Sequence, residues 1–238
     1  MHIKEVFSRM NPIVKVEHVK KSFTVGENEV IAVRDISFSI DKGEFVSCVG
    51  PSGSGKTTLL NLIGTIEHPT EGSIIIDGEN VTKFSPNELA KFRRRKIGFV
   101  FQFFNLIDGL TAYENVELPL IFDYQDYSER RKKVNKLFDD FDLNHLKHKF
   151  PEELSSGERQ RVAIMRSIVN DPVILLCDEA TGNLDSQTGQ RVLELLQELN
   201  EKKNTTILMV THNLSAAKVA KRTIHMRDGV IEKETKRN

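Results

Sequence analysis

The stretch Gly50-Pro51-Ser52-Gly53-Ser54-Gly55-Lys56-Thr57 constrains this chain more than any other part of its sequence. It fits the pattern G-x-x-x-x-G-K-S/T, in which glycines let the backbone wrap closely around phosphate oxygens. Residues 44–49 before it are mostly apolar and predict a buried strand, and residues 58–63 after it can continue as a helix. Strand, glycine-rich turn and helix in this order predict a loop that holds the phosphates of a nucleoside triphosphate.

The chemistry of this loop assigns roles to its polar groups. Successive N–H groups in such a turn point inward as donors, and the following helix adds the partial positive charge of its N-terminus. Lys56 is predicted to reach the β- and γ-phosphates, and the Thr57 hydroxyl to ligate Mg²⁺. A glycine- and serine-rich loop with a chance lysine is the alternative, which the flanking strand and helix disfavour. The predicted nucleotide-binding residues here are Gly50, Pro51, Ser52, Gly53, Ser54, Gly55, Lys56, Thr57 and Thr58.

The composition is that of an ordinary globular chain without a global charge bias. Its 34 Lys and Arg residues balance 34 Asp and Glu residues, so nothing global indicates nucleic-acid binding. Basic runs at 93–96 and 130–133 adjoin helix-like sequence and predict solvated helix faces. Cys48 and Cys177 lie in apolar runs and predict small buried core residues, as expected in a reducing cytosol. No stretch approaches the apolar length that spans a bilayer and no signal peptide is apparent, so we expect a soluble, cytoplasmic protein.

The order of the predicted elements indicates an α/β fold with a helical insertion. Alternating residues at 14–19 and 36–40 predict an antiparallel layer, and apolar runs at 97–101, 173–177 and 205–210 predict the buried strands of a sheet. Residues 111–169 are helix-like without a clear strand. Caps or starts of successive helices are predicted at Thr111, for a helix through Leu118, at Ser128 and at Gly157, and Asp185 is predicted to cap a helix at 186–199.

Asp178 and Glu179 directly follow the predicted strand at 173–177. A carboxylate at the C-terminal edge of such a sheet lies beside the phosphate-binding loop in nucleotide-binding folds. We expect Asp178 to hold Mg²⁺, directly or through water, and Glu179 to polarise the attacking water. An acidic N-cap of the next helix is the alternative. His212 follows another predicted strand at the same edge, where it would donate to the γ-phosphate and orient Glu179 unless it is an ordinary surface or core histidine.

The stretch Leu154-Ser155-Ser156-Gly157-Glu158-Arg159-Gln160-Arg161 resembles the signature motif of ATP-binding cassette (ABC) ATPases. The phosphate loop, Gln102, this signature, Asp178-Glu179, the stretch 182–185 and His212 follow one another as in that family. The resemblance implies a P-loop α/β core with a mostly parallel sheet and flanking helices, plus an antiparallel β layer and a helical insert. It implies one ABC ATPase domain at 14–232, with a helical subdomain at about 103–169 inserted in its RecA-like core. Residues 1–13 would form an N-terminal extension, either a short amphipathic helix or a frayed tail, and 233–238 a polar tail.

The resemblance also implies how the signature works. Ser155 supplies a hydroxyl and Gly157 a bare N–H, at a helix start whose positive end favours phosphate. In the family this element faces the γ-phosphate bound by the other subunit, so an ATP-dependent homodimer with two sandwiched ATP molecules is implied. Residues 182–185 resemble the D-loop that crosses this interface. Phe23 stands where the family has an aromatic that stacks on adenine, with a core phenylalanine as the alternative.

The signature departs from the family's usual Leu-Ser-Gly-Gly-Gln. Ser156 replaces a glycine and adds a Cβ where the backbone approaches phosphate. Glu158 replaces the glutamine and brings a carboxylate near the nucleotide held by the other copy. We therefore expect weaker ATP-driven dimerisation than in close relatives. Ala180 stands where relatives usually carry proline, and we expect little effect from it.

Residues 102–107 and 110–120 are similar to one subfamily, the ATPases of the macrolide-exporter and lipoprotein-release type, which also includes a cell-division branch. In these ATPases the residue matching Gln102 contacts Mg²⁺ or its water, and the following loop forms a groove that receives a coupling helix of a membrane subunit. Phe103, Phe104 and Leu106 line this groove, pack the helical insert, or divide between the two roles.

The resemblance thus implies a subunit that binds and hydrolyses ATP with Mg²⁺ and drives a separate integral membrane transporter, at the inner face of the cell membrane and without nucleic acid. A soluble ABC ATPase of assembly or maintenance, with no membrane partner, is the alternative. The implied catalytic residues are Glu179, His212, Lys56 and Gln102, and the implied metal-binding residues are Thr57, Gln102 and Asp178. Beyond the phosphate loop, the implied nucleotide contacts are Phe23, Ser155, Gly157 and Glu158.

Overall fold

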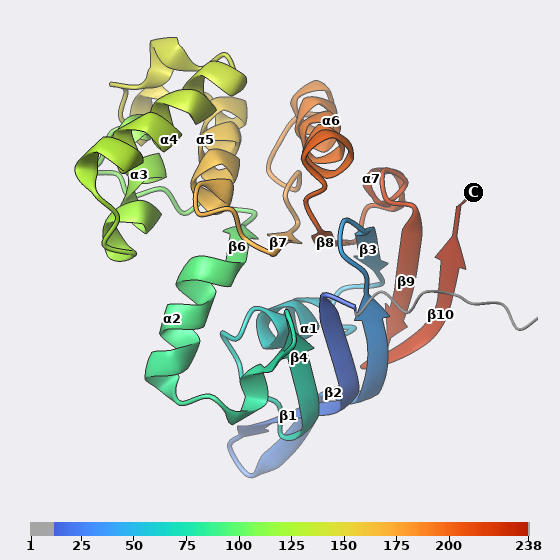
Figure 1. The fold of residues 1–238 in the computed structure, drawn as a ribbon. Coiled ribbons are helices and arrows are strands. Elements are labelled where there is room, and N and C mark those ends of the chain that lie inside the picture. The colour runs from blue at the N-terminus through green and yellow to red at the C-terminus, as the bar shows by residue number, and fades with distance from the viewer. Residues whose placement is uncertain (1–11, 238) are drawn as a thin grey trace, which may run out of the picture.

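The computed structural model describes residues 12–237, so most of the predicted N-terminal extension lies outside the described residues. Two β-sheets lie one above the other, with helices between and around them (Figure 1). The four-stranded sheet has the order β2-β1-β4-β5 and the six-stranded sheet the order β10-β9-β3-β8-β7-β6. Neighbouring strands from β6 to β9 are parallel, whereas β10 is antiparallel to β9, and the four-stranded sheet is antiparallel throughout. The predicted fold class is therefore confirmed.

The strands are β1 (Val14–Val25), β2 (Asn28–Ile40), β3 (Phe45–Val49), β4 (Glu71–Ile76), β5 (Glu79–Asn80), β6 (Ile97–Val100), β7 (Ile174–Asp178), β8 (Ile207–Thr211), β9 (Arg222–Arg227) and β10 (Val230–Lys236). The α-helices are α1 (Lys56–Ile63), α2 (Pro86–Lys96), α3 (Ala112–Phe122), α4 (Tyr127–Asp140), α5 (Ser156–Ile168), α6 (Ser186–Lys203) and α7 (Leu214–Ala217). Short 3₁₀ turns lie at Val81–Lys83, Asn144–Leu146 and Pro151–Glu153. No helix within residues 12–237 has the length and apolar character needed to cross a membrane.

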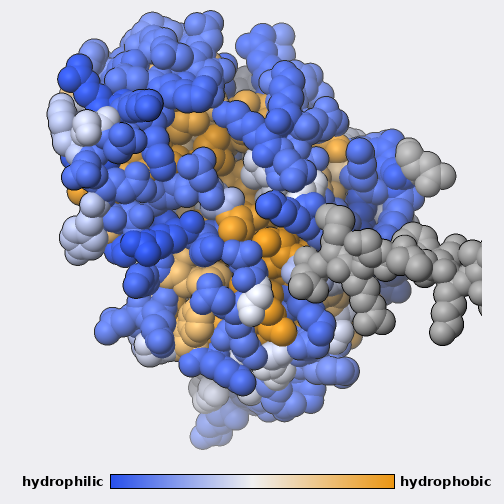
Figure 2. Space-filling view, in the orientation of Figure 1, coloured by the Kyte–Doolittle hydropathy of each residue, from blue (hydrophilic) through white to orange (hydrophobic). Residues whose placement is uncertain are grey.

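Strands β3, β7 and β8 at the centre of the six-stranded sheet are buried on both faces, which explains their mostly apolar sequences. In β7, Leu175 and Cys177 pack among the helices α3 to α6, while Ile174 and Leu176 pack toward α1 and the antiparallel sheet. Helix α1 contacts β2 as well as β7 and β8, so it lies between the two sheets. Figure 2 shows the result from outside: hydrophilic side chains cover most of the visible face, and hydrophobic ones gather in the seam between the upper helices and the lower sheet.

Helices α3, α4 and α5 form a lobe beyond β6, at one end of the core sheet (Figure 1). Thr111 caps α3 in a reciprocal capping box with Glu114, as predicted for its start. The predicted end at Leu118 is wrong, because α3 continues through Pro119 to Phe122 and buries Leu120 completely. Ser128, the predicted cap of the next helix, is also wrong, because Asp126 occupies the N-cap position of α4.

Helix α4 begins two positions earlier than Ser128 predicts. Its first main-chain bond runs from the N–H of Arg130 to the carbonyl of Asp126, and the Arg130 guanidinium also donates to the carbonyl of Gln125. Helix α5 likewise begins at Ser156 rather than Gly157, with Ser155 as its N-cap. Asp185 caps α6 by accepting the N–H groups of Gln187 and Thr188, as predicted.

The basic run at 93–96 is more than a solvated helix face. Arg93 donates to the carbonyl of Thr65, and Arg95 pairs with Asp123 at 2.6 Å. Lys96 pairs with Asp77, also at 2.6 Å, so the run fastens α2 to its neighbours. The two cysteines are free and buried, as predicted, and burial raises the pKa of the Cys48 thiol to about 12.

Candidate active site

The loop between β3 and α1 encloses a pocket of about 260 Å³. Gly55 ends this loop with φ of 93°, and a Cβ there would lie 2.2 Å from the carbonyl oxygen of Ala32, so only glycine fits. Helix α1 starts at Lys56, so the unpaired N–H groups of its first turn are presented to the pocket. The pocket is lined by Ala32, Ser52, Gly53, Gly55, Lys56, Thr57, Thr58, Glu179 and His212.

Lys56 is a nearly buried cation, with 7% of its surface exposed. Its ammonium group donates to the carbonyl oxygen of Pro51 at 2.8 Å and approaches the hydroxyl of buried Ser54 at 3.4 Å. Within residues 12–237 no carboxylate forms an ion pair with it. A buried charge held only by neutral oxygens favours an anionic ligand, and a phosphate fits this donor set.

Thr57 lines the pocket and contacts Asp178, which does not itself line it. The Thr57 hydroxyl donates to Oδ1 of Asp178 at 3.2 Å. Burial raises the pKa of Asp178, the neighbouring charge of Glu179 raises it further, and the Thr57 hydrogen bond and Lys56 offset only part of this. No group of three or more His, Cys, Asp or Glu side chains among residues 12–237 is arranged to hold a metal ion. Mg²⁺ keeps several waters and pairs one or two protein oxygens with substrate phosphates, so this sparse set of hard oxygens fits it.

Glu179 and His212 come together as predicted. Glu179 has φ of 49°, a left-handed conformation that costs on the order of 1–3 kcal/mol and turns the chain at the end of β7. Its carboxylate accepts the Thr211 hydroxyl at 3.1 Å, the main-chain N–H of His212 at 3.0 Å and the Nδ1 of His212 at 2.8 Å. Because a carboxylate only accepts, Nδ1 carries the proton in this contact. His212 can then donate to a phosphate through Nε2 only as the imidazolium.

Gln102 and Phe23 do not line this pocket. The side-chain amide of Gln102 bonds instead to Asn183, a residue that the sequence placed in the D-loop-like stretch without a role of its own. Phe23 is half-buried on β1, opposite Val30 of β2, with the Lys21 ammonium 4.7 Å from its ring centroid. The alternative of a core phenylalanine is therefore wrong, and one face of the ring already holds a cation.

The signature residues lie outside the pocket, at the start of α5. Ser155 and Glu158 form a capping box: Oε2 of Glu158 accepts the hydroxyl of Ser155 at 2.7 Å and its main-chain N–H at 2.8 Å. Burial raises the pKa of Glu158, but the hydrogen bonds from Ser155 outweigh it and the pKa is lowered overall. A Cβ on Gly157 would lie 2.4 Å from the Thr188 side chain, a packing constraint that the sequence did not reveal.

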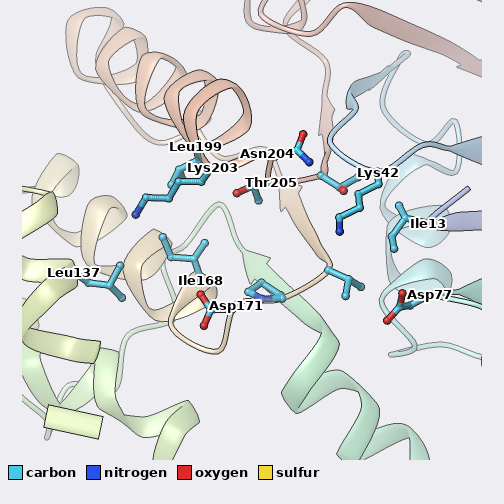
Figure 3. Close-up of a pocket in the computed structure, with 13 residues that line it drawn as sticks. Ile13, Lys42, Asp77, Leu137, Ile168, Asp171, Leu199, Lys203, Asn204 and Thr205 are labelled. Carbon is cyan, nitrogen blue, oxygen red and sulfur yellow. The ribbon is translucent and has the colours of Figure 1, made fainter. Parts of the chain in front are cut away.

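A second cavity, of about 430 Å³, lies at the opposite edge of the core sheet, before the starts of β3, β7 and β8 (Figure 3). Two of the charged side chains that line it are held in ion pairs: Lys203 contacts Asp140 at 3.1 Å and Asp77 contacts Lys96 at 2.6 Å. None of the predicted site residues lines it. The candidate active site is therefore the pocket at the C-terminal edge of the sheet.

A phosphate loop, an Asp-Glu pair at a strand end and a histidine at one edge of a mostly parallel sheet define a P-loop nucleoside triphosphatase. Residues 33–182 match the family described as ABC transporter. The uncharacterized ABC transporter ATP-binding protein MJ0796 of Methanocaldococcus jannaschii is 44% identical over 94% of this chain and 97% of its own length. The ABC transporter ATP-binding protein YtrE of Bacillus subtilis is 46% identical over 92% of this chain and 97% of its own.

A solved dimer of the MJ0796 cassette, in a post-hydrolysis state bound to ADP and Pi, matches this structure with a TM-score of 0.86 and 45% identity, over 94% of this chain and 99% of that one. The macrolide export ATP-binding/permease protein MacB of Campylobacter jejuni is 46% identical over 90% of this chain, which spans 33% of that longer protein. This chain belongs to the ABC transporter family as an ATP-binding cassette. It is an ATPase that uses ATP with Mg²⁺, as the resemblance implied.

Proposed function

We propose that the chain dimerises around two ATP molecules and drives a separate integral membrane protein, to which it binds from the inner face of the cell membrane. One cassette at 14–232 would do this, with its helical subdomain at about 103–169 as the moving part. The observation that carries the proposal is an apolar groove between α2, β6 and α3, beside the loop that follows Gln102.

The groove has a volume of about 570 Å³. Phe99 and Phe101 stack in it with ring centroids 5.4 Å apart, and Phe122, 58% exposed, stands at its edge. An exposed apolar groove of this kind suits the apolar face of a helix from a partner. It is lined by Ala90, Arg94, Ile97, Gly98, Phe99, Phe101, Asn105, Leu118, Pro119, Phe122, Arg166, Ser167 and Asn170.

The groove is connected to both nucleotide-facing elements. Phe101 directly precedes Gln102 in the chain. Arg166 of α5 lines the groove and donates to the carbonyl oxygens of Phe104 and Asn105, at 2.8 and 2.6 Å. The first residue before that same helix is Ser155. A helix bound in the groove would therefore move together with the start of α5. Closure of the dimer, which moves α5, would in this way also move the membrane partner.

The chemistry follows from the residues of the pocket. Lys56 and the loop around it hold the phosphates, while Thr57, Asp178 and Gln102 would hold Mg²⁺, which would supply positive charge beside the transferred phosphoryl group. Glu179 takes the proton of the attacking water, and His212 holds the Glu179 carboxylate in place. Ser155 and the N–H of Gly157 of a second copy would complete the donor set at the γ-phosphate, so each site needs its twin. The relative MJ0796 is a dimer in its structure bound to ADP and Pi, which supports the dimeric part of this proposal.

A single experiment tests the membrane partner. The tagged chain is purified from its own membranes, the copurified integral membrane protein is identified, and ATPase activity is measured with and without that protein in lipid. We expect Phe122→Asp to abolish the stimulation and leave basal hydrolysis intact. Leu214→Asp is the matched control, because Leu214 is similarly exposed, at 63% against 58% for Phe122, but lies on α7. Stimulation that survives Phe122→Asp would show that the membrane partner binds outside this groove, whereas the absence of any stimulating membrane protein would favour a soluble ATPase of assembly or maintenance.

A further inference from the structure

Gln102 and Asn183 form a reciprocal pair between two loops. Nε2 of Gln102 donates to Oδ1 of Asn183 at 3.2 Å, and Nδ2 of Asn183 donates to the main-chain carbonyl oxygen of Gln102 at 3.0 Å. Gln102 follows β6 and Asn183 follows β7, which are neighbouring parallel strands of the core sheet (Figure 1). The pair thus joins the loop that leads to the groove with the D-loop-like stretch.

The geometry fixes which way both amides face. A main-chain carbonyl only accepts, so the end of the Asn183 amide beside it must be the donor, Nδ2. Its other end, Oδ1, then faces Gln102 and requires a donor there, which is Nε2. The Oε1 oxygen of Gln102 is consequently the end that Asn183 leaves free. A free amide oxygen is the kind of ligand that Mg²⁺ or its bound water takes from a protein.

Gly182 leaves room for this contact and connects it to the main chain of Glu179. A Cβ on Gly182 would lie 2.9 Å from Nε2 of Gln102, so a larger residue would press on the amide. The N–H of Gly182 donates to the carbonyl oxygen of Glu179 at 2.8 Å. The position of Asn183 is thereby set by the same turn that carries Glu179.

We propose that Asn183 is a positioning residue that fixes the Gln102 amide with Nε2 on Asn183 and leaves Oε1 free to take the metal ion or its bound water. This inference rests on the proposed role of Gln102 as a metal-site residue. Without Asn183 the amide rotates freely, and half of its orientations present an N–H, which a cation repels. Outer partners that orient a metal ligand commonly change metal affinity by about 10-fold or more when removed.

The test is a double-mutant cycle read as Mn²⁺ affinity. Mn²⁺ is titrated by electron paramagnetic resonance into the full chain saturated with a non-hydrolysable ATP analogue, for the unmodified protein, Gln102→Ala, Asn183→Ala and the double variant. We expect each single variant to weaken Mn²⁺ binding about 10-fold, and the double variant to be no weaker than Gln102→Ala alone. Affinity for the nucleotide in EDTA should stay unchanged throughout, which excludes misfolding. Gln187→Ala is the matched control, because it removes an exposed amide from the start of α6.

Each of the other outcomes contradicts the inference, and each shows which part of it is wrong. If Gln102→Ala weakens Mn²⁺ binding and Asn183→Ala does not, the proposed role of Gln102 stands and that of Asn183 falls. If the two losses add, Asn183 acts independently of Gln102. If Gln102→Ala has no effect, the metal role of Gln102 falls together with the inference, while the roles of Lys56 and Glu179 are untouched.

Discussion

The phosphate loop and the signature each stand at the start of a helix, and each is proposed to bind phosphate. They differ in how far one copy of the chain prepares them for that ligand. At α1, the loop leaves the Lys56 ammonium buried on neutral oxygens, beside Thr57. At α5, the Ser155 hydroxyl and main-chain N–H are already bound by the chain's own Glu158. The first site is built to take an anion within one copy. The second is satisfied alone, so a phosphate has to compete with Glu158 for its donors.

Under the proposed function, this difference places the control of hydrolysis at the dimer. One copy would suffice to capture the nucleotide, whereas a second copy would complete the site, and its helix start would have to give up the contact with Glu158. Variants on the α1 side should therefore abolish binding or chemistry. Variants on the α5 side should act on the dimer, and by smaller factors.

The largest effect is expected for Glu179, the carboxylate that follows β7 and lines the pocket beside the start of α1. Glu179→Gln removes the proposed general base, which should lower ATP turnover by about 10²- to 10⁴-fold and trap an ATP-bound dimer. Steady-state hydrolysis and size-exclusion chromatography with ATP measure the two effects. Glu198→Gln, on the exposed face of α6, is the control and should match the unmodified protein. A monomeric, fully active Glu179→Gln protein would refute the assignment of the base.

Lys56→Met and Ser155→Ala together test whether the two helix starts differ in their effect on ATP binding by a single copy. Removing the buried ammonium is expected to reduce turnover by about 10²- to 10³-fold, with loss of ATP binding by the single copy. Ser155→Ala should leave ATP binding by the single copy unchanged and impair only dimerisation. Calorimetry below the dimerisation concentration, followed by light scattering above it, separates these cases. Equal loss of single-copy binding in both variants would break the comparison.

Glu158→Gln tests whether the carboxylate at the α5 start opposes the nucleotide of the other copy. An acidic residue here stabilises its own helix start but repels a phosphate, and charge effects at a helix end are about 0.3–1 kcal/mol. We expect ATP-driven dimerisation to tighten by about two- to fivefold in Glu158→Gln, measured by analytical ultracentrifugation at low salt in the Glu179→Gln background. Unchanged dimerisation would show that the carboxylate stays folded onto Ser155 and never meets the phosphate.

The smallest effect concerns pH. Hydrogen bonds from Ser155 lower the pKa of Glu158 in the folded chain, so the unfolded chain binds more protons around that pKa. The stability that Glu158 contributes is therefore complete above its unfolded pKa and is lost as pH falls through its folded pKa. Urea unfolding of the unmodified protein and of Glu158→Gln should diverge at neutral pH and converge in acid. Parallel pH curves for the two proteins would contradict the capping role.

The strands and the phosphate loop could be predicted because their signals are local. The run at 173–177 is apolar at every position because both faces of β7 are buried, and the helix caps Thr111 and Asp185 need only neighbouring residues. Helix ends that depend on tertiary packing were missed. Helix α3 passes its predicted end because Leu120 finds a place in the core despite Pro119.

The pocket was predicted more completely than the contacts around it. Lys56, Thr57, Asp178, Glu179 and His212 carry motifs that specify their positions at one sheet edge. The hydrogen bond between Gln102 and Asn183 joins residues far apart in the chain, and no sequence pattern predicts it. The Glu158 side chain was expected to reach outward, and only its geometry reveals that it caps its own helix.

In the proposed dimer, one ATP is bound between the Lys56 loop of one copy and the start of α5 of the other. A crystal structure of the Glu179→Gln variant with ATP and Mg²⁺ tests it most directly. The account predicts a dimer in which the Ser155 hydroxyl and the Gly157 N–H of one copy donate to the γ-phosphate held by Lys56 of its twin. A structure with ATP bound by Lys56 and Ser155 turned away from every phosphate, in every copy and assembly, would contradict it.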